Sequence, residues 1–296
     1  METTAATTSL PRRAATIKML TGAARGDQVF RIGLTVCASA IPVLLLALVA
    51  MLVRSAAPAI VRFGPTFATT SVWDPVAGQF GAWPMILGTL LTSLLALLMA
   101  VPLSLGVAIY LTEFAPRWLR QPVSMVIELL AAIPSVVYGL WGVFVLIPLL
   151  QHAVFPFLRS VLGFLPFFRG VIYGPSVLAA SIILAIMVMP FIMSVSREVL
   201  RAVPNSQREA AMALGATRWE AVRTAIVPYA RSGIIGAIIL GLGRALGETM
   251  AVTMLIGNRH EISASLFAPG YTMAAAIANE FNEAATPMHD AALTYV

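Results

Sequence analysis

The feature that most constrains this chain is a series of apolar runs, nearly free of charge and each long enough to cross a bilayer as a helix. The first runs from Ile32 to Val53, and at about 1.5 Å per residue it covers the roughly 30 Å hydrocarbon core. The other four are Pro84 to Leu111, Pro122 to Leu150, Pro175 to Ser196 and Ser232 to Gly257. The pattern predicts an all-α membrane protein with five complete spans.

Composition and internal prolines agree with a membrane bundle. The chain is 59% hydrophobic and only 11% charged, whereas charged residues make up about a quarter of a soluble protein. Pro102, Pro134 and Pro190 lie inside three of the runs. Each removes a backbone hydrogen bond that neighbouring helices must compensate, so we expect the spans to pack together.

The distribution of basic residues predicts the orientation. Thirteen of the 19 Lys and Arg fall in the tail 1–31, the connection 113–121 and the loop 197–231, and five fall in the opposite connections. Because Lys and Arg concentrate on the cytoplasmic side, we expect the tail and the 197–231 loop to be cytoplasmic. The net charge of +6 is thereby explained without a nucleic-acid partner.

The sequence also supports predictions for the two ends of the chain. The first ten residues are rich in Ala and Thr and are predicted to be disordered. The first run is preceded by 31 residues and exceeds a signal-peptide core, so we interpret it as an uncleaved anchor. Ala291 to Tyr295 begins another apolar helix, which we interpret as the start of a sixth span interrupted at Val296. A five-span alternative would leave the C terminus outside.

The 197–231 loop is predicted to form two short helices. Ser206 with Glu209 and Thr217 with Glu220 both fit the S/T-x-x-E capping box. Gly215 stands where a left-handed residue would end the first helix.

Small apolar residues on the first of these helices suit docking of another protein. Ala210 to Leu214 form this surface, flanked by Arg208 and Arg218. Amphipathic helices lying on lipid headgroups are an alternative. A DNA-binding helix-turn-helix is a weaker one, because tethering between two spans leaves little reach for a duplex.

Three ionisable residues lie inside the runs: Glu128, Arg244 and Glu248. Charges at this depth are costly and therefore mark candidate functional positions. Arg244 is about 20 Å from either end of a straight fifth span, and Glu248 follows at i+4, where the two can pair and leave guanidinium donors for an anion. A self-satisfied ion pair is the structural alternative. Glu128 lies near the cytoplasmic end and is interpreted as structural, because either snorkelling to the surface or pairing with a loop arginine would accommodate its charge.

Gly243 and Gly247 form a G-x-x-x-G pattern beside this pair. The pattern lets a helix pack closely on another, so we expect the fifth span to line a shared pathway.

Three features of the sequence argue against catalysis or metal binding by this chain. The single lysine, Lys18, has no phosphate-binding loop around it, so nucleotide hydrolysis must occur on another subunit. One cysteine and three scattered histidines give neither a disulfide framework nor metal-ligand spacing. We therefore expect a transport subunit, not an enzyme, with no metal and no bound cofactor.

The loop resembles a known motif. Glu209-Ala210-Ala211, then Gly215, then a hydrophobic pair before Pro228 resemble the EAA loop of ABC importer permeases, whose short helices insert into the ATPase subunit. The resemblance implies a type I ABC importer transmembrane domain over 32–296. It implies coupling roles for Glu209, Ala210, Ala211, Gly215, Arg218 and Pro228.

Three further stretches, 133–144, 241–252 and 263–274, resemble the PstC-type membrane subunits of bacterial phosphate importers. The resemblance implies a second homologous permease, two ATPase subunits that bind ATP and Mg, and a periplasmic phosphate-binding protein. It associates Arg244 and Glu248 with phosphate passage across the inner membrane.

Other functions remain open from the residues alone. A permease for sulfate or molybdate would also use a mid-membrane arginine. A membrane-embedded enzyme such as a lipid phosphotransferase would need a nucleophile or carboxylate cluster, for which Glu280 with Glu283 is too sparse. A passive channel would leave the docking loop without a purpose.

Overall fold

The computed structural model describes residues 11–296, with side chains from residue 26 onward. The chain divides into two compact units after Ala57, and each is described by itself. In the first, α1 (Pro11–Phe63) is one uninterrupted helix that extends beyond both ends of the predicted first span and enters the second unit. The disorder predicted for the first ten residues lies outside the described residues.

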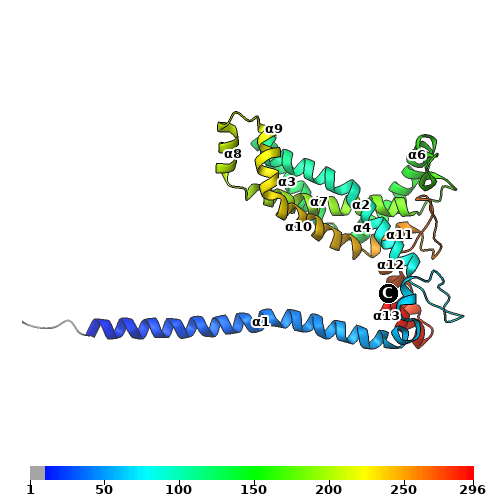
Figure 1. Cartoon of the computed structure of the whole chain (residues 1–296), viewed down its shortest axis with the longest axis horizontal. Coiled ribbons are helices and arrows are strands. Elements are labelled where there is room, and N and C mark those ends of the chain that lie inside the picture. Colours follow the sequence, from blue (N-terminus) through cyan, green and yellow to red (C-terminus); the bar gives the residue numbers. More distant parts are fainter. Residues whose placement is uncertain (1–10) are drawn as a thin grey trace, which may run out of the picture. The chain divides into compact units, whose positions relative to one another are not determined.

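The second unit, Pro58–Val296, is built from helices and connecting loops (Figure 1). Within it no β-strand forms, apart from an isolated bridge between Asp74 and Gln79. Its α-helices are α2 (Trp83–Ile109), α3 (Arg117–Ala132), α4 (Ser135–Trp141), α5 (Ile147–Leu149), α6 (Phe155–Leu162), α7 (Val177–Arg201), α8 (Asn205–Ala213), α9 (Arg218–Ala221), α10 (Val227–Leu246), α11 (Met250–Ile256), α12 (Met273–Glu280) and α13 (Pro287–Tyr295).

Shorter 3₁₀ and π turns extend or join several of these helices. The 3₁₀ turns are η1 (Gly64–Ala68), η5 (Pro166–Phe168) and η7 (Phe281–Glu283), and the π turns are η2 (Tyr110–Phe114), η3 (Gly142–Leu146), η4 (Leu150–Val154) and η6 (Val222–Ile226).

Five helical stretches of the described chain are long and apolar enough to span a membrane, which confirms the predicted number. They are Gly26–Ala68, Trp83–Phe114, Ser135–Leu162, Val177–Arg201 and Arg218–Leu246. The predicted bounds of the third and fifth spans were wrong. The start of a sixth span stays a prediction, because α13 supplies only nine helical residues there.

The third span begins later than predicted because the helix breaks at Pro134. Ile133 and Pro134 adopt extended backbone between α3 and α4, as expected for a residue that precedes proline and for a proline without a donor N–H. The stretch from Arg117 to Ala132 is therefore a separate helix with a polar stripe along it.

Helix α7 is the centre of the second unit and packs against α2, α3, α10 and α11. A Cβ added to Gly241 of α10 would come within 2.6 Å of Ile192 and 3.2 Å of Val188 on α7, so glycine permits the close approach of these two helices. The resulting core consists of small and branched aliphatic side chains from several spans.

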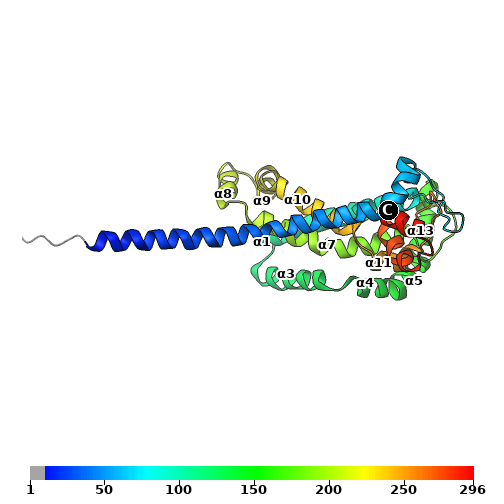
Figure 2. The ribbon, with the colours of Figure 1, turned by 90° about the horizontal axis from the view of Figure 1, so that it is seen from below.

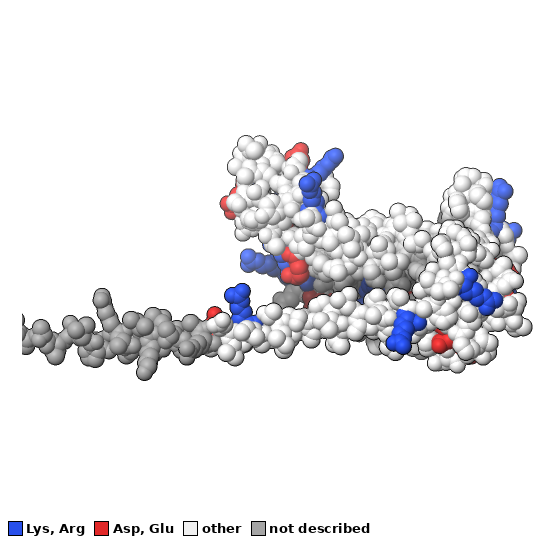
Figure 3. Space-filling model, turned by 60° about the horizontal axis from the view of Figure 1, so that its bottom comes forward, with Lys and Arg blue, Asp and Glu red and all other residues white. Residues whose placement is uncertain are grey.

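The second unit has two distinct ends (Figures 1 and 2). Helices α8 and α9 lie at one end of α7 and α10, here called the α8 end, and α6 lies at the other, here called the α6 end. On the face drawn in Figure 3, most Lys, Arg, Asp and Glu side chains of this unit gather toward these two ends, and the surface between them is largely uncharged. Such a distribution suits helices that cross a bilayer.

Candidate functional site

The fifth apolar run is interrupted next to its charged residues. Helix α10 ends at Leu246, residues 247–249 are not helical, and α11 begins at Met250. Arg244 therefore lies in the last turn of α10, and Glu248 lies in the break. Discontinuous helices of this kind commonly form substrate sites in transporters.

The predicted pairing of Arg244 with Glu248 was wrong. The break removes Glu248 from the helical track that would have placed it one turn beyond Arg244. The Oε1 atom of Glu248 instead accepts a hydrogen bond from the backbone N–H of Ala251, at 3.3 Å, in the first turn of α11. Among the described residues Arg244 has no ion-pair partner, and its side chain is exposed.

Glycines give α10 two different faces. Gly241 and Gly233 lie against α7, where an added Cβ would meet Ile192 or Val199. A Cβ at Gly236 or Gly243 would meet no other element of the second unit within 4 Å. Ile235, Ile239 and Leu240 are also exposed, each by more than half. This face of α10 is apolar and uncovered in this chain, and Arg244 is exposed beside it.

The loop at the α8 end confirms the predicted two-helix turn. Gly215 has φ +86°, the left-handed conformation that glycine adopts without strain. Thr217 and Glu220 form the predicted capping box, with reciprocal side chain to backbone hydrogen bonds. The box predicted at Ser206 and Glu209 is absent, because α8 already begins at Asn205 and Ser206 falls inside its first turn.

The residues proposed for docking lie on the surface of this loop. Glu209, Ala210 and Arg218 are exposed and Ala211 is half-buried. Leu214 is 90% exposed and Trp219 is 59% exposed, an uncovered apolar patch beside charged residues. Pro228 is exposed in the first turn of α10, directly after the π turn η6. The stretch from Arg218 to Leu246 is continuously helical, so α9 is joined rigidly to the turn that carries Arg244.

Arg208 anchors the loop to the bundle, a role that the sequence analysis missed. Its Nη2 donates to Glu113 Oε1 at 2.8 Å and to the carbonyl of Leu200 at 3.0 Å. Its Nη1 donates to the carbonyl of Val203 at 2.6 Å. Glu113 is 95 residues away in sequence, and no local pattern signals the contact.

A polar cluster at the α6 end surrounds Glu280. The indole N–H of Trp73 donates to Glu280 Oε2 at 2.8 Å, and the Nε2 atoms of His260 and His289 lie 3.3 and 3.4 Å from the carboxylate oxygens. Burial alone would raise the pKa of Glu280, but the contacts with His260, Trp73 and Tyr271 outweigh it, and the pKa lies below its ordinary value. The cluster therefore holds an ionised carboxylate at the end of α12 that contacts two loops, through Trp73 and His260, and α13, through His289.

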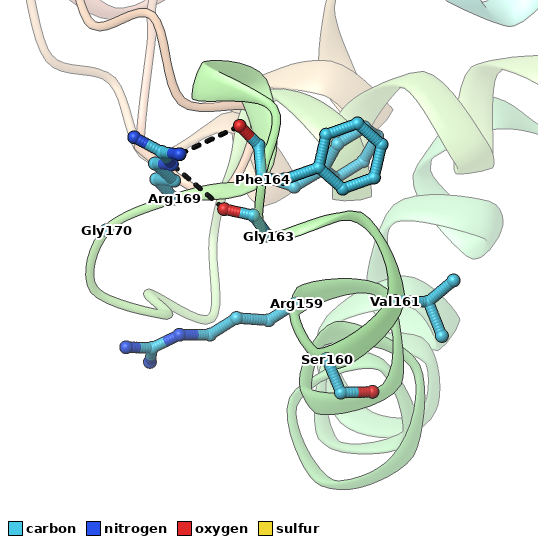
Figure 4. A pocket seen from close by; sticks show the side chains of 8 residues that line it. Arg159, Ser160, Val161, Gly163, Phe164, Arg169 and Gly170 are labelled. Carbon is cyan, nitrogen blue, oxygen red and sulfur yellow. Dashed lines mark hydrogen bonds between the residues drawn. The ribbon is translucent and has the colours of Figure 1, made fainter.

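A second feature of the α6 end is a basic hollow of about 400 Å³ after α6. Figure 4 shows Arg169 donating to the backbone carbonyls of Gly163 and Phe164, at 2.9 and 2.8 Å. Arg169 is thus occupied in holding the loop. Arg159 extends without such a bond in the same view.

Long apolar helices, a break beside an exposed arginine and a surface loop of two short helices define a multi-pass membrane protein of the permease class. The family described as "Binding-protein-dependent transport system inner membrane component" matches residues 100–279, and the chain belongs to this family.

The sequence is 52% identical over 246 residues to the "Phosphate transport system permease protein PstC" of Haemophilus influenzae, covering 82% of this chain and 78% of that protein. It is 46% identical over 274 residues to the protein of the same name from Xylella fastidiosa, covering 91% and 85%. These relatives confirm the resemblance drawn from the motifs.

Proposed function

We propose that this chain is a membrane permease subunit of an ATP-driven importer that carries inorganic phosphate. The observation that carries the proposal is its high identity, over most of its length, to proteins named as phosphate transport permeases. The uncovered Arg244 supports it, because a guanidinium without a protein partner can interact with a passing oxyanion.

Arg244 is the proposed electrostatic contact for phosphate inside the membrane. The adjacent face of α10 carries Gly236 and Gly243, which leave room for a neighbouring helix. A second, homologous permease subunit packed on this face would enclose Arg244 in a shared pathway. Glu248 has the supporting role of stabilising the start of α11 through Ala251, so that the break keeps its shape.

The α8 end is the proposed docking site of two ATPase subunits, which bind ATP and Mg; this chain itself binds no cofactor in the proposal. The exposed residues Glu209, Ala210 and Leu214 would enter a cleft of the ATPase. Because the helix is continuous from Arg218 to Leu246, a displacement of α9 is transmitted to Arg244 without a flexible joint. Such a rigid link suits alternating access.

The proposed orientation follows from the basic residues. The α8 end and the N-terminal tail face the cytoplasm, and the α6 end faces the periplasm. A periplasmic phosphate-binding protein would then deliver its ligand to the loops 151–174 and 258–289, which include the Glu280 cluster and the hollow beside Arg159.

Uptake in cells tests the proposal. The subunit is produced together with its partner permease, ATPase and binding protein in a host without its own high-affinity phosphate importer. We expect uptake of labelled phosphate at low external concentration, lost when the ATPase is inactivated. An assembled complex that takes up no phosphate would refute the proposed substrate.

A further inference from the structure

A second basic site lies between α3 and α7, away from Arg244. A cavity of about 430 Å³ opens there, within the range of small-ligand sites. The residues that line it all carry polar or charged groups: Arg117, Arg120, Gln121, Ser124, Glu128, Arg197 and Arg201. The fold thus brings four arginines from two helices to one hollow near the α8 end.

The spacing of these residues explains the cavity. On α3 the polar residues recur from Arg117 through Ser124 to Glu128, at intervals that place them along one helix face. On α7, Arg197 and Arg201 are four residues apart and share a face in the last turns of the helix. Since α3 packs against α7, the two polar stripes meet across the cavity.

Arg197 is the fixed group of the site. Its side chain is only 4% exposed, and Nη2 donates to Glu128 Oε1 at 2.9 Å and to Glu198 Oε1 at 3.4 Å. Nε and Nη1 are buried and have no hydrogen-bond partner among the described residues. A buried guanidinium with two unpartnered nitrogens is a strong donor for an anion.

Arg120 repeats this pattern on α3. Its Nη2 is held by the carbonyls of Thr112 and Ala115, at 3.0 and 3.3 Å, while its buried Nε has no partner in the described part of the chain. Arg117 and Arg201 are exposed at the rim. Of these two, Arg201 makes an ion-pair contact, with its Nη1 atom 3.6 Å from Glu198 Oε1.

The charge of the cavity matches a multivalent anion. Four arginines line the cavity with one carboxylate, that of Glu128, and Glu198 beside it contacts Arg197 and Arg201, which leaves an excess of positive charge. Both carboxylates are more than half exposed, so they can yield their contacts with Arg197 to a ligand. Arginine is suited to phosphate because its planar fork of N–H groups fits tetrahedral oxyanions.

We propose that this cavity binds a phosphate group, with Arg197 and Arg120 as fixed donors and Arg117 and Arg201 as mobile ones. Two sources share this chemistry: inorganic phosphate and the headgroup of an anionic phospholipid. The inorganic source rests on the transport function proposed above, whereas the cavity is independent of Arg244.

Binding measurements on the whole complex test the site. The complex carries Arg244→Gln, so that the proposed transport contact does not contribute. Equilibrium binding of labelled inorganic phosphate is measured in phosphatidylcholine nanodiscs, and retention of phosphatidylglycerol is measured by lipid mass spectrometry after purification. We expect Arg197→Gln to weaken either phosphate binding or phosphatidylglycerol retention by about tenfold or more, which is the effect of removing a charge-assisted hydrogen bond.

The two arms separate the sources. Phosphate affinity that depends on Arg197 and is unaffected by phosphatidylglycerol assigns the site to the inorganic ion; phosphatidylglycerol retention that depends on Arg197 assigns it to the lipid. The double variant Arg117→Gln/Arg201→Gln changes only exposed side chains, so it tests the site even if Arg197→Gln fails to fold. It should weaken binding of the same ligand. Arg223→Gln, an exposed arginine outside the cavity, is the matched control.

Two results overturn the proposal. In one, neither phosphate binding nor phosphatidylglycerol retention changes in Arg197→Gln or in Arg117→Gln/Arg201→Gln. In the other, Arg223→Gln has the same effect as the cavity variants, because binding then follows net charge alone. Loss of phosphate transport in Arg244→Gln with cavity binding intact would show that the two proposals stand separately.

Discussion

Arg244 and Glu248, four residues apart, acquire different partners because the helix stops between them. Glu248 accepts a hydrogen bond at the start of α11, and Arg244 remains exposed beside the uncovered face of α10. A charge without a partner inside an apolar run is costly, so a functional role for Arg244 is better supported than the self-satisfied ion pair.

Neutralising Arg244 should stop transport without disturbing the fold. Because the side chain makes no ion pair in the described chain, we expect Arg244→Gln to assemble normally. Loss of a charge-assisted contact with phosphate should lower uptake by about ten- to a hundredfold or more. Arg231→Gln, another exposed arginine on α10, is the control and should transport normally. Wild-type uptake by Arg244→Gln would exclude the proposed contact.

The lowered pKa of Glu280 predicts that stability at the α6 end depends on pH. Its folded pKa lies below the ordinary value of 4.5, so its contribution to stability is present above about pH 4.5 and is lost as pH falls through the folded pKa. At neutral pH we expect Glu280→Gln to destabilise by about 1.5–3 kcal/mol, the range for hydrogen bonds to charged groups.

Thermal unfolding of both proteins across pH checks this prediction. The gap in melting temperature should narrow as pH falls from about 4.5 through the folded pKa, because the wild-type carboxyl then becomes neutral as well. A gap that is the same at pH 7 and at the lowest pH at which both proteins stay folded would show that the charge of Glu280 does not stabilise the cluster.

At the scale of elements, the loop at the α8 end was predictable and the interruptions of the spans were not. Gly215 and the Thr217–Glu220 capping box are local signals, and both helices formed around them. Pro134 is a local signal for the break, but we expected it to remove one hydrogen bond inside a helix and not to end the helix. The break after Leu246 has no proline to signal it, and hydropathy continues across it.

Most polar contacts between distant segments could not be predicted from the sequence either. Of the two arrangements considered for Glu128, snorkelling and pairing with an arginine, the structure has the pairing, with Arg197. The anchoring of Arg208 by Glu113 and the cluster around Glu280 join residues separated by up to 207 positions. Such contacts depend on the packing of the helices, which charge and periodicity do not specify.

The turn at Gly215 predicts that coupling depends on backbone conformation. At φ +86° a β-branched residue costs about 1–3 kcal/mol, so Gly215→Val should distort the loop. We expect the complex to assemble poorly or to hydrolyse ATP without phosphate uptake. Gly215→Asn is the control, because asparagine tolerates left-handed backbone. Normal coupled transport by Gly215→Val would show that this turn does not transmit motion.

For the whole molecule, the orientation can be measured by labelling single cysteines. The natural Cys37 is first replaced by Ala, and Leu214→Cys and Phe164→Cys are made separately at positions that are 90% and 68% exposed. The subunit is produced without the ATPase, which would otherwise cover Leu214, and an impermeant maleimide applied to spheroplasts should label Phe164→Cys at once and Leu214→Cys only after permeabilisation. The reverse pattern would invert the proposed topology.

The central claim is that this subunit forms part of a phosphate pathway driven by ATP. The most direct measurement is ATP-dependent uptake of labelled phosphate into proteoliposomes that contain the subunit, its partner permease, the ATPase and the binding protein. Excess unlabelled phosphate should abolish uptake, and excess sulfate or molybdate should not. ATP hydrolysis with uptake of sulfate or molybdate, but not of phosphate, would contradict the account.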